Sequence, residues 1–188
     1  MSGWSAWQTA SLARRNDHQA AVHWEIGGGM DRVIDEACTA IARLRPWSRG
    51  GERAPHKPLL LLLAFERTRA GRPRLVAFTE IETPLRDLIA TFGPTRARYH
   101  PEYPFWRLQA DGLWEVEDAA AFGSRASNTD PPITELRSRG ARGGLPAPLD
   151  RALRSDAAAL QRVSDLTLSL HFEEDVDAVR RALSSLAT

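Results

Sequence analysis

Pro58-Leu59-Leu60-Leu61-Leu62-Leu63-Ala64-Phe65 is the stretch that decides the fold. Proline is tolerated in the first turn of a helix because its missing N–H has no intrahelical partner there. Apolar residues on every side of the next turns are typical of a helix that is buried all round. We expect Gly71 to end this helix. The sequence therefore predicts a central, buried helix.

The segments that flank this helix predict one helix before it and a strand and a helix after it. Apolar residues at helical spacing indicate a helix over 31–45 that ends at Pro46, and residues 47–55 read as a polar, basic loop. A short strand is expected at 74–78. Thr79 and Glu82 match a capping box, with a helix over 83–92 that ends at a left-handed Gly93.

The C-terminal half predicts a hairpin, loops and two further helices. Asp111-Gly112 between 105–109 and 113–116 is a hairpin signal. Loops are expected at 122–132 and 137–144, and helices at 148–164 and 175–186. The predicted fold class is α+β: a single compact, mostly helical domain with a small antiparallel sheet. Residues 1–29, which end in three glycines, are predicted to be an extension, and 30–188 the domain.

Composition and charge limit the possible classes of function. The chain has 188 residues, a net charge of +1 and a single cysteine, Cys38, which excludes an internal disulfide. No apolar run approaches the roughly 20 residues of a membrane helix, so the expected location is the cytoplasm. Residues 47–110 carry eleven basic against six acidic residues, and 125–154 carry six against three. If the fold joins these two blocks, one face is positive and suits nucleic acid.

No group of residues forms a convincing catalytic centre. The five histidines are scattered, and no nucleophile elbow, phosphate-binding loop or zinc motif is present. Glu115 and Glu117 could be metal ligands, but an acidic outer face of the hairpin is the favoured interpretation. We therefore predict no catalytic residues, no metal and no cofactor.

Two segments contain the candidate ligand-binding residues. The first is the run 99–109, in which aromatic rings alternate with prolines, so that a stiff backbone could frame an apolar hollow with a cationic rim of Arg98, His100 and Arg107. The second is His56-Lys57, at the entry to the buried helix, where free N–H groups and the helix dipole favour an anion. Lys57 is the only lysine.

Taken together, these segments resemble a known family. Ala54-Pro55-His56-Lys57-Pro58-Leu59, followed later by His100-Pro101-Glu102-Tyr103-Pro104-Phe105-Trp106-Arg107-Leu108, resembles the sulfur-binding domain of McrA-type restriction endonucleases. The likeness runs from about residue 30 to the C-terminus and includes His171-Phe172. It implies binding of double-stranded DNA whose backbone carries a phosphorothioate, with one non-bridging oxygen replaced by sulfur. Because the family usually continues into an HNH nuclease domain, such a domain in cis or in trans is an expected partner.

The resemblance also implies roles for individual residues. Tyr103 and Pro104 would line the sulfur pocket, with His56, Lys57 and Arg107 around it. Trp106 and Arg107 stand where the family has a small residue and would form its far wall. Further DNA contacts are expected from arginines of the two basic blocks, Arg142 foremost, and the set is Arg49, Arg53, Arg98, Arg137, Arg139 and Arg142.

The residues leave other functions open. The main alternative is a general DNA-binding or transcription regulatory domain without sulfur selectivity, in which the aromatic run is only core. A protein-interaction module and a metal-dependent nuclease that uses Glu115 and Glu117 are further alternatives. Binding to paired duplexes with and without sulfur separates these functions.

Overall fold

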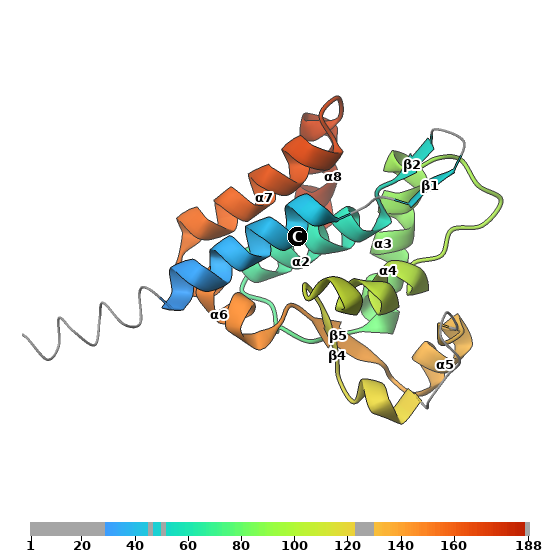
Figure 1. Cartoon of the computed structure of the whole chain (residues 1–188). Helices are drawn as coiled ribbons and strands as arrows, with labels where there is room; N and C mark the ends of the chain where they lie inside the picture. The colour runs from blue at the N-terminus through green and yellow to red at the C-terminus, as the bar shows by residue number, and fades with distance from the viewer. Residues whose placement is uncertain (1–28, 45–46, 50–51, 123–129, 187–188) are drawn as a thin grey trace, which may run out of the picture.

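The helix α2 (His56–Arg69) lies at the centre of the molecule (Figure 1). A computed structural model describes residues 29–44, 47–49, 52–122 and 130–186. Leu59, Leu60 and Leu61 have no exposed surface, because α2 is surrounded by other helices. The helices in contact with it are α3 (Phe78–Phe92), α4 (Glu102–Arg107), α6 (Ala147–Ser155), α7 (Ala157–His171) and α8 (Val176–Leu186). The predicted buried helix is confirmed.

The first described helix covers residues 29–43, close to the predicted 31–45. It is joined to α7 by an ion pair in which the Arg162 Nη2 group donates to Asp35 Oδ1 at 3.0 Å. The predicted extension, 1–29, lies outside the described residues except for Gly29, which already belongs to this helix. Among the described residues, no helix is long and apolar enough to span a bilayer.

A three-stranded antiparallel sheet joins distant parts of the chain. Its order is β3 (Val76–Ala77), β5 (Arg142–Gly144) and β4 (Glu115–Val116), with Gly143 opposite both Val76 and Val116. The expected strand at 74–78 is confirmed but is shorter than predicted. The sheet lies below α2 in the view of Figure 1.

The predicted loop at 137–144 is wrong. Arg137 belongs to α5 (Ile133–Ser138), and Arg142 begins the central strand β5. A Cβ atom at Gly143 would lie 2.5 Å from Trp114 Nε1, and one at Gly144 would lie 2.2 Å from the Arg74 carbonyl oxygen. These two glycines therefore permit close packing rather than a flexible loop.

The predicted loop at 47–55 is also wrong, because it contains a small antiparallel ribbon. Strands β1 (Trp47–Arg49) and β2 (Glu52–Ala54) pair with Trp47 opposite Ala54. The sequence between the strands, Gly50-Gly51, is a recognised two-residue hairpin signal that the prediction did not use.

The predicted hairpin around Asp111-Gly112 is wrong for its first strand, at 105–109. Residues 105–109 belong to α4 and to the 3₁₀ helix η1 (Leu108–Asp111), and only β4 on the second side is a strand. Pro104 occupies the first turn of α4, where its missing N–H has no intrahelical partner. Gly112 has φ of 72° and ends η1 in a left-handed conformation. Asp-Gly therefore marks a helix end here.

Three helix boundaries also differ from the prediction. Helix α3 begins at Phe78 rather than 83, with no side-chain cap, and contains Pro84; the Phe78 N–H is satisfied by the Ala141 carbonyl at 2.7 Å. Gly93 has φ of −103°, so the predicted left-handed stop is wrong. The expected helix at 148–164 is divided into α6 and α7 at Asp156, whose carboxylate accepts from the N–H groups of the first turn of α7. The predicted fold class, mostly helical α+β, is confirmed.

Candidate nucleic-acid interface

The fold brings the two sequence motifs together. His56 and Lys57 open α2, whose first turn has no side-chain cap, and α2 packs against α4. Helix α4 carries the remaining residues of the predicted pocket, Tyr103, Pro104, Trp106 and Arg107. The uncapped N–H groups of α2 are the feature of this junction that favours an anion.

Tyr103 is held in a fixed orientation at the surface. Its ring stacks on His100 with centroids 4.7 Å apart and an interplanar angle of 13°. The guanidinium carbon of Arg107, one helical turn further on, lies 4.6 Å from the centroid of the same ring. The Tyr103 ring therefore contacts both a stacked imidazole and a guanidinium. Tyr103 nevertheless stays 37% exposed, which leaves its edge open to a ligand.

A buried carboxylate supports this stack from below. The Nδ1–H of His100 donates to Glu102 Oε1 at 2.8 Å, and Glu102 is only 7% exposed. Its second oxygen, Oε2, has no hydrogen-bond partner among the described residues. The hydrogen bond between His100 and Glu102 therefore orients the imidazole that lies against Tyr103.

Both cations of the predicted pocket are paired with carboxylates. The Lys57 ammonium donates to Asp111 Oδ2 at 2.5 Å, and each of these side chains is about one-quarter exposed. The Arg107 Nε–H donates to Asp130 Oδ2 at 2.6 Å. A phosphate group that binds these cations must therefore compete with Asp111 and Asp130.

We expect Asp111→Asn to strengthen DNA binding about two- to fivefold. The substitution removes a carboxylate that neutralises Lys57 and repels phosphate, and part-exposed pairs of this kind are worth only about 1 kcal/mol or less. The measurement is the dissociation constant for a fixed duplex at low salt. Asp165→Asn on α7, which removes the partner of Arg180, is the matched control and should leave the affinity unchanged. Weaker binding by Asp111→Asn would contradict this role.

The inner face of α4 is part of the core. Pro104 is buried, and Trp106 is half-buried with its ring edge-on to Phe122, which ends the short 3₁₀ helix η2 (Ala119–Phe122), at 5.4 Å. Tyr103 and Arg107 lie on the exposed face of the same helix. The two residues predicted to form the far wall of the pocket therefore lie apart. Arg107 contacts Tyr103, while Trp106 packs toward η2.

Positive charge gathers around His56. This half-buried imidazole has its pKa lowered, first by burial and then by the neighbouring charges of His100 and Arg96. An added Cβ at Gly93, which ends α3, would lie 3.7 Å from His56 Nε2. The imidazole is thus enclosed between the end of α3 and the segment that leads to α4. A phosphate at this point would offset the repulsion among these groups.

The lowered pKa of His56 predicts a pH-dependent stability. Below about pH 6.5, the ordinary pKa of histidine, the unfolded chain binds a proton at His56 that the folded chain resists. The free energy of unfolding should therefore fall as the pH is lowered through this range. In urea unfolding at successive pH values, His56→Gln should show a shallower fall than the wild type. Equal slopes would contradict the prediction.

The predicted arginine contacts are unequally available. Arg137 is tied to Glu82 through Nε at 2.9 Å and Nη2 at 2.5 Å. Arg139 donates to the Ala121 carbonyl at 2.8 Å, whereas exposed Arg142 is only within 3.5 Å of Glu117. Arg98 is exposed and has no hydrogen-bond or ion-pair partner among the described residues. Arg49 and Arg53 lie on the β1–β2 ribbon.

Sequence analysis did not identify the acidic partners of the site. Glu102 lies two residues after His100, a spacing that could have indicated the pair. Asp111 could have been found from Asp-Gly as a helix end. Asp130 and Glu82 reach their arginines across the fold, and no local signal predicts such contacts.

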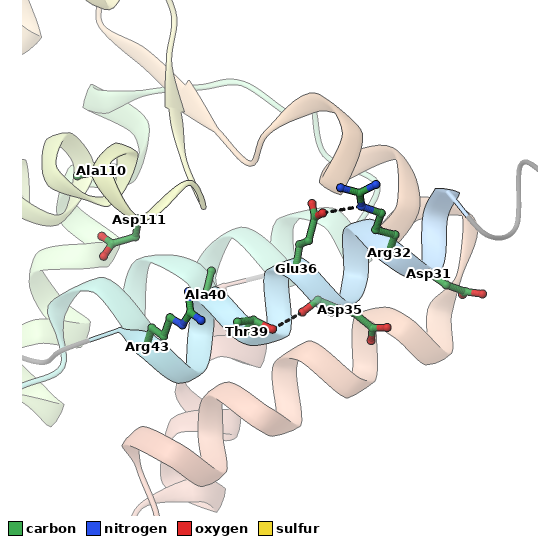
Figure 2. A pocket seen from close by; sticks show the side chains of 9 residues that line it. All are labelled: Asp31, Arg32, Asp35, Glu36, Thr39, Ala40, Arg43, Ala110 and Asp111. Atoms are coloured by element: carbon green, nitrogen blue, oxygen red, sulfur yellow. Dashed lines mark hydrogen bonds and ion pairs between the residues drawn. The ribbon is translucent and has the colours of Figure 1, made fainter.

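A groove beside this site is unsuited to DNA. Figure 2 shows it between the first helix and the end of η1, with a volume of about 780 Å³. Four carboxylates line it against two arginines: Asp31, Asp35, Glu36 and Asp111 against Arg32 and Arg43. This excess of negative charge repels phosphate. Among the described residues, no cluster of three or more His, Cys, Asp or Glu side chains could hold a metal ion.

Comparison with known proteins identifies the family. A model of the ScoMcrA-like DNA sulfur-binding domain matches residues 34–183. The solved sulfur-binding domain of ScoMcrA, complexed with phosphorothioated DNA, is 24% identical, with a TM-score of 0.68 over 80% of this chain and 98% of that chain. The corresponding domain of SprMcrA, also complexed with phosphorothioated DNA, is 21% identical, with a TM-score of 0.65 over 80% and 93%.

A larger structure shares the same fold. The sulfur-binding and SRA domains of ScoMcrA, complexed with phosphorothioated DNA, match at 24% identity and a TM-score of 0.71, over 79% of this chain and 47% of that chain. A comparison with curated proteins gives no match. The solved structures show the fold, and the family model spans most of the chain. This chain therefore belongs to the family of ScoMcrA-like DNA sulfur-binding domains.

Proposed function

We propose that this chain binds phosphorothioate-modified double-stranded DNA and is the recognition module of a modification-dependent restriction system in the cytoplasm. Family membership and the related domains solved with phosphorothioated DNA support this function. The observation that carries it is Tyr103, an exposed ring in contact with His100 and Arg107 where α4 meets the N-terminus of α2.

The physical basis of discrimination is the difference between sulfur and oxygen. Sulfur is larger, more polarizable and a poorer hydrogen-bond acceptor than oxygen. The carbon edge of Tyr103 offers oxygen no replacement for lost water, a penalty of about 1–3 kcal/mol. Sulfur loses less hydration and gains dispersion contacts. A preference of roughly 10- to 100-fold for sulfur follows from such energies.

The positively charged groups around Tyr103 then bind the phosphates of the DNA backbone. The N–H groups of α2, with His56 and Lys57, face the phosphate. Lys57 breaks its ion pair with Asp111 and pairs with the phosphate instead. Arg107 similarly exchanges Asp130 for phosphate. Arg98 and Arg142, which are exposed, contact the DNA first, and Arg142 can read guanine through O6 and N7. Arg49, Arg53, Arg137 and Arg139 supply secondary contacts.

Residues 30–188 act in recognition without catalysis of their own, and a nuclease domain in cis or in trans cleaves the DNA. Glu115 and Glu117, the alternative metal ligands, are within 2.7 Å of Arg74 and 3.5 Å of Arg142, respectively. Carboxylates neutralised by arginine are poor candidates for binding Mg²⁺. No cofactor is required for the proposed binding.

The test is the affinity of the intact chain for two duplexes of one sequence, with and without a phosphorothioate. We expect the sulfur-containing duplex to bind roughly 10- to 100-fold more tightly. Equal affinities would support a general DNA-binding domain instead. An absence of salt-dependent binding would support a protein-interaction module, and Mg²⁺-dependent nicking would support the nuclease alternative.

A further inference from the structure

A cationic cavity lies apart from the Tyr103 site. It has a volume of about 450 Å³ and is enclosed by the C-terminal half of α2, the turn that follows it, the start of α3, β5 and the end of α8. No residue of α4 or of the first turn of α2 lines it. Its polar lining consists of Arg67, Arg72, Arg142 and a single carboxylate, Glu80. The cavity is therefore positive overall.

Two of these arginines lack a directly bonded partner. Among the described residues, the guanidinium groups of Arg67 and Arg72 form no hydrogen bond or ion pair. Arg67 is half-buried, and its pKa is lowered, first by burial and also by Arg72, while Glu80 acts in the opposite direction. A partly buried charge without a partner is costly, so this arrangement calls for an anion.

The neighbouring Arg69 shows that the local sequence can neutralise an arginine. It forms an ion pair with Glu66 and donates to Gln161 Oε1 at 3.1 Å. Arg67 lies two residues earlier on the same helix but faces the cavity, away from these partners. Arg67 therefore lacks a directly bonded partner because it faces the cavity, and not because the helix offers no partners to its arginines.

The shape and chemistry of the walls define the ligand class. Two adjacent guanidiniums match the oxygens of a phosphate group, to which arginine binds in bidentate geometry. Leu63, Ile81 and Leu186 form apolar walls beside them. Apolar walls with a few convergent polar groups are typical of sites for small organic ligands.

We propose that this cavity binds a phosphate-bearing ligand, with the phosphate on Arg67 and Arg72 and an apolar or planar body against Leu63, Ile81 and Leu186. Two sources share this chemistry. One is a free mononucleotide, and the other is a DNA backbone phosphate remote from Tyr103. This site is distinct from the Tyr103 site, because none of its lining residues belongs to α4 or to the first turn of α2, and only Arg142 is both a lining residue and an expected DNA contact.

The test is calorimetric titration of the intact chain at low salt with AMP, with inorganic pyrophosphate and with a short unmodified duplex. Arg67→Gln is the test variant, and Arg69→Gln is the matched control on the same helix. We expect saturable binding of AMP or of the duplex that Arg67→Gln weakens about tenfold or more, because a charge-assisted contact is lost. Arg69→Gln should bind as the wild type does.

The outcomes identify the source or overturn the proposal. Arg67-dependent binding of AMP identifies a free nucleotide, and Arg67-dependent binding of the duplex alone identifies the DNA backbone. Binding of pyrophosphate alone, if it depends on Arg67, supports the phosphate site and overturns the role of the apolar walls. Equal losses in Arg67→Gln and Arg69→Gln, or no binding of any probe, would overturn the proposal. Tyr103→Ala should bind AMP normally, so failure here is distinct from failure of sulfur recognition.

Discussion

Tyr103→Ala is expected to abolish the preference of this domain for phosphorothioated DNA. The wild-type preference of roughly 10- to 100-fold should fall to about one, because the substitution removes the exposed apolar edge that penalises oxygen and contacts sulfur. It also removes the ring that His100 and Arg107 contact. The measurement is fluorescence anisotropy with paired duplexes of one sequence, with and without the sulfur atom.

Two further variants make this result specific. Tyr103→Phe keeps the ring and its carbon edge, so it should retain most of the preference. Arg142→Ala should weaken binding to both duplexes by a similar factor, because its expected contact is with bases or backbone and not with sulfur. A Tyr103→Ala protein that still distinguishes the two duplexes would show that the sulfur lies elsewhere.

Phe105→Ala should destabilise the fold by about 3–5 kcal/mol. Phe105 has no exposed surface, and its ring meets Phe78 edge-on at 5.0 Å and Trp114 at 5.7 Å. These contacts anchor α4, the helix that carries Tyr103, to α3 and to the segment before β4. Urea unfolding of the wild type and the variant measures the difference.

The matched control for Phe105→Ala is Leu170→Ala, near the end of α7. Leu170 is 44% exposed, so its loss should change the free energy of unfolding by about 0.5 kcal/mol or less. A loss below about 1 kcal/mol for Phe105→Ala would mean that α4 is not anchored through this ring.

Local patterns predicted the helical frame well. The leucine run of α2 is apolar on every side, and only burial on all sides satisfies such a helix. The first helix was likewise predicted from apolar spacing, which depends on neighbours three and four residues apart. These signals are contained within each segment, so they do not require knowledge of the tertiary structure.

The errors arose where a local signal has two structural meanings. Asp111-Gly112 was interpreted as a hairpin turn, but the left-handed Gly112 ends η1 instead. Gly143 and Gly144 were interpreted as part of a loop, but they lie in the central strand. Their lack of a side chain allows Trp114 and Arg74 to approach closely. Distant contacts decide between the two meanings in each case, and the local sequence does not contain them.

The candidate site shows the same division. His56, Lys57 and Tyr103 were identified from the sequence, and the fold brings their two segments together at the junction of α2 and α4. Their carboxylate partners were not identified, because Asp111 meets Lys57 across 54 positions of sequence and Asp130 meets Arg107 across 23. The sequence therefore indicated two segments that the fold brings together, but not the carboxylates that pair with their cations.

The most direct test of sulfur recognition is the affinity of the intact chain for the paired duplexes over a series of salt concentrations. Phosphate contacts release counterions, so both affinities should fall steeply as salt rises. Discrimination by an apolar pocket does not depend on counterions, so the ratio of the two affinities should stay between roughly 10 and 100 throughout. A ratio near one at every salt concentration would contradict sulfur recognition by this domain.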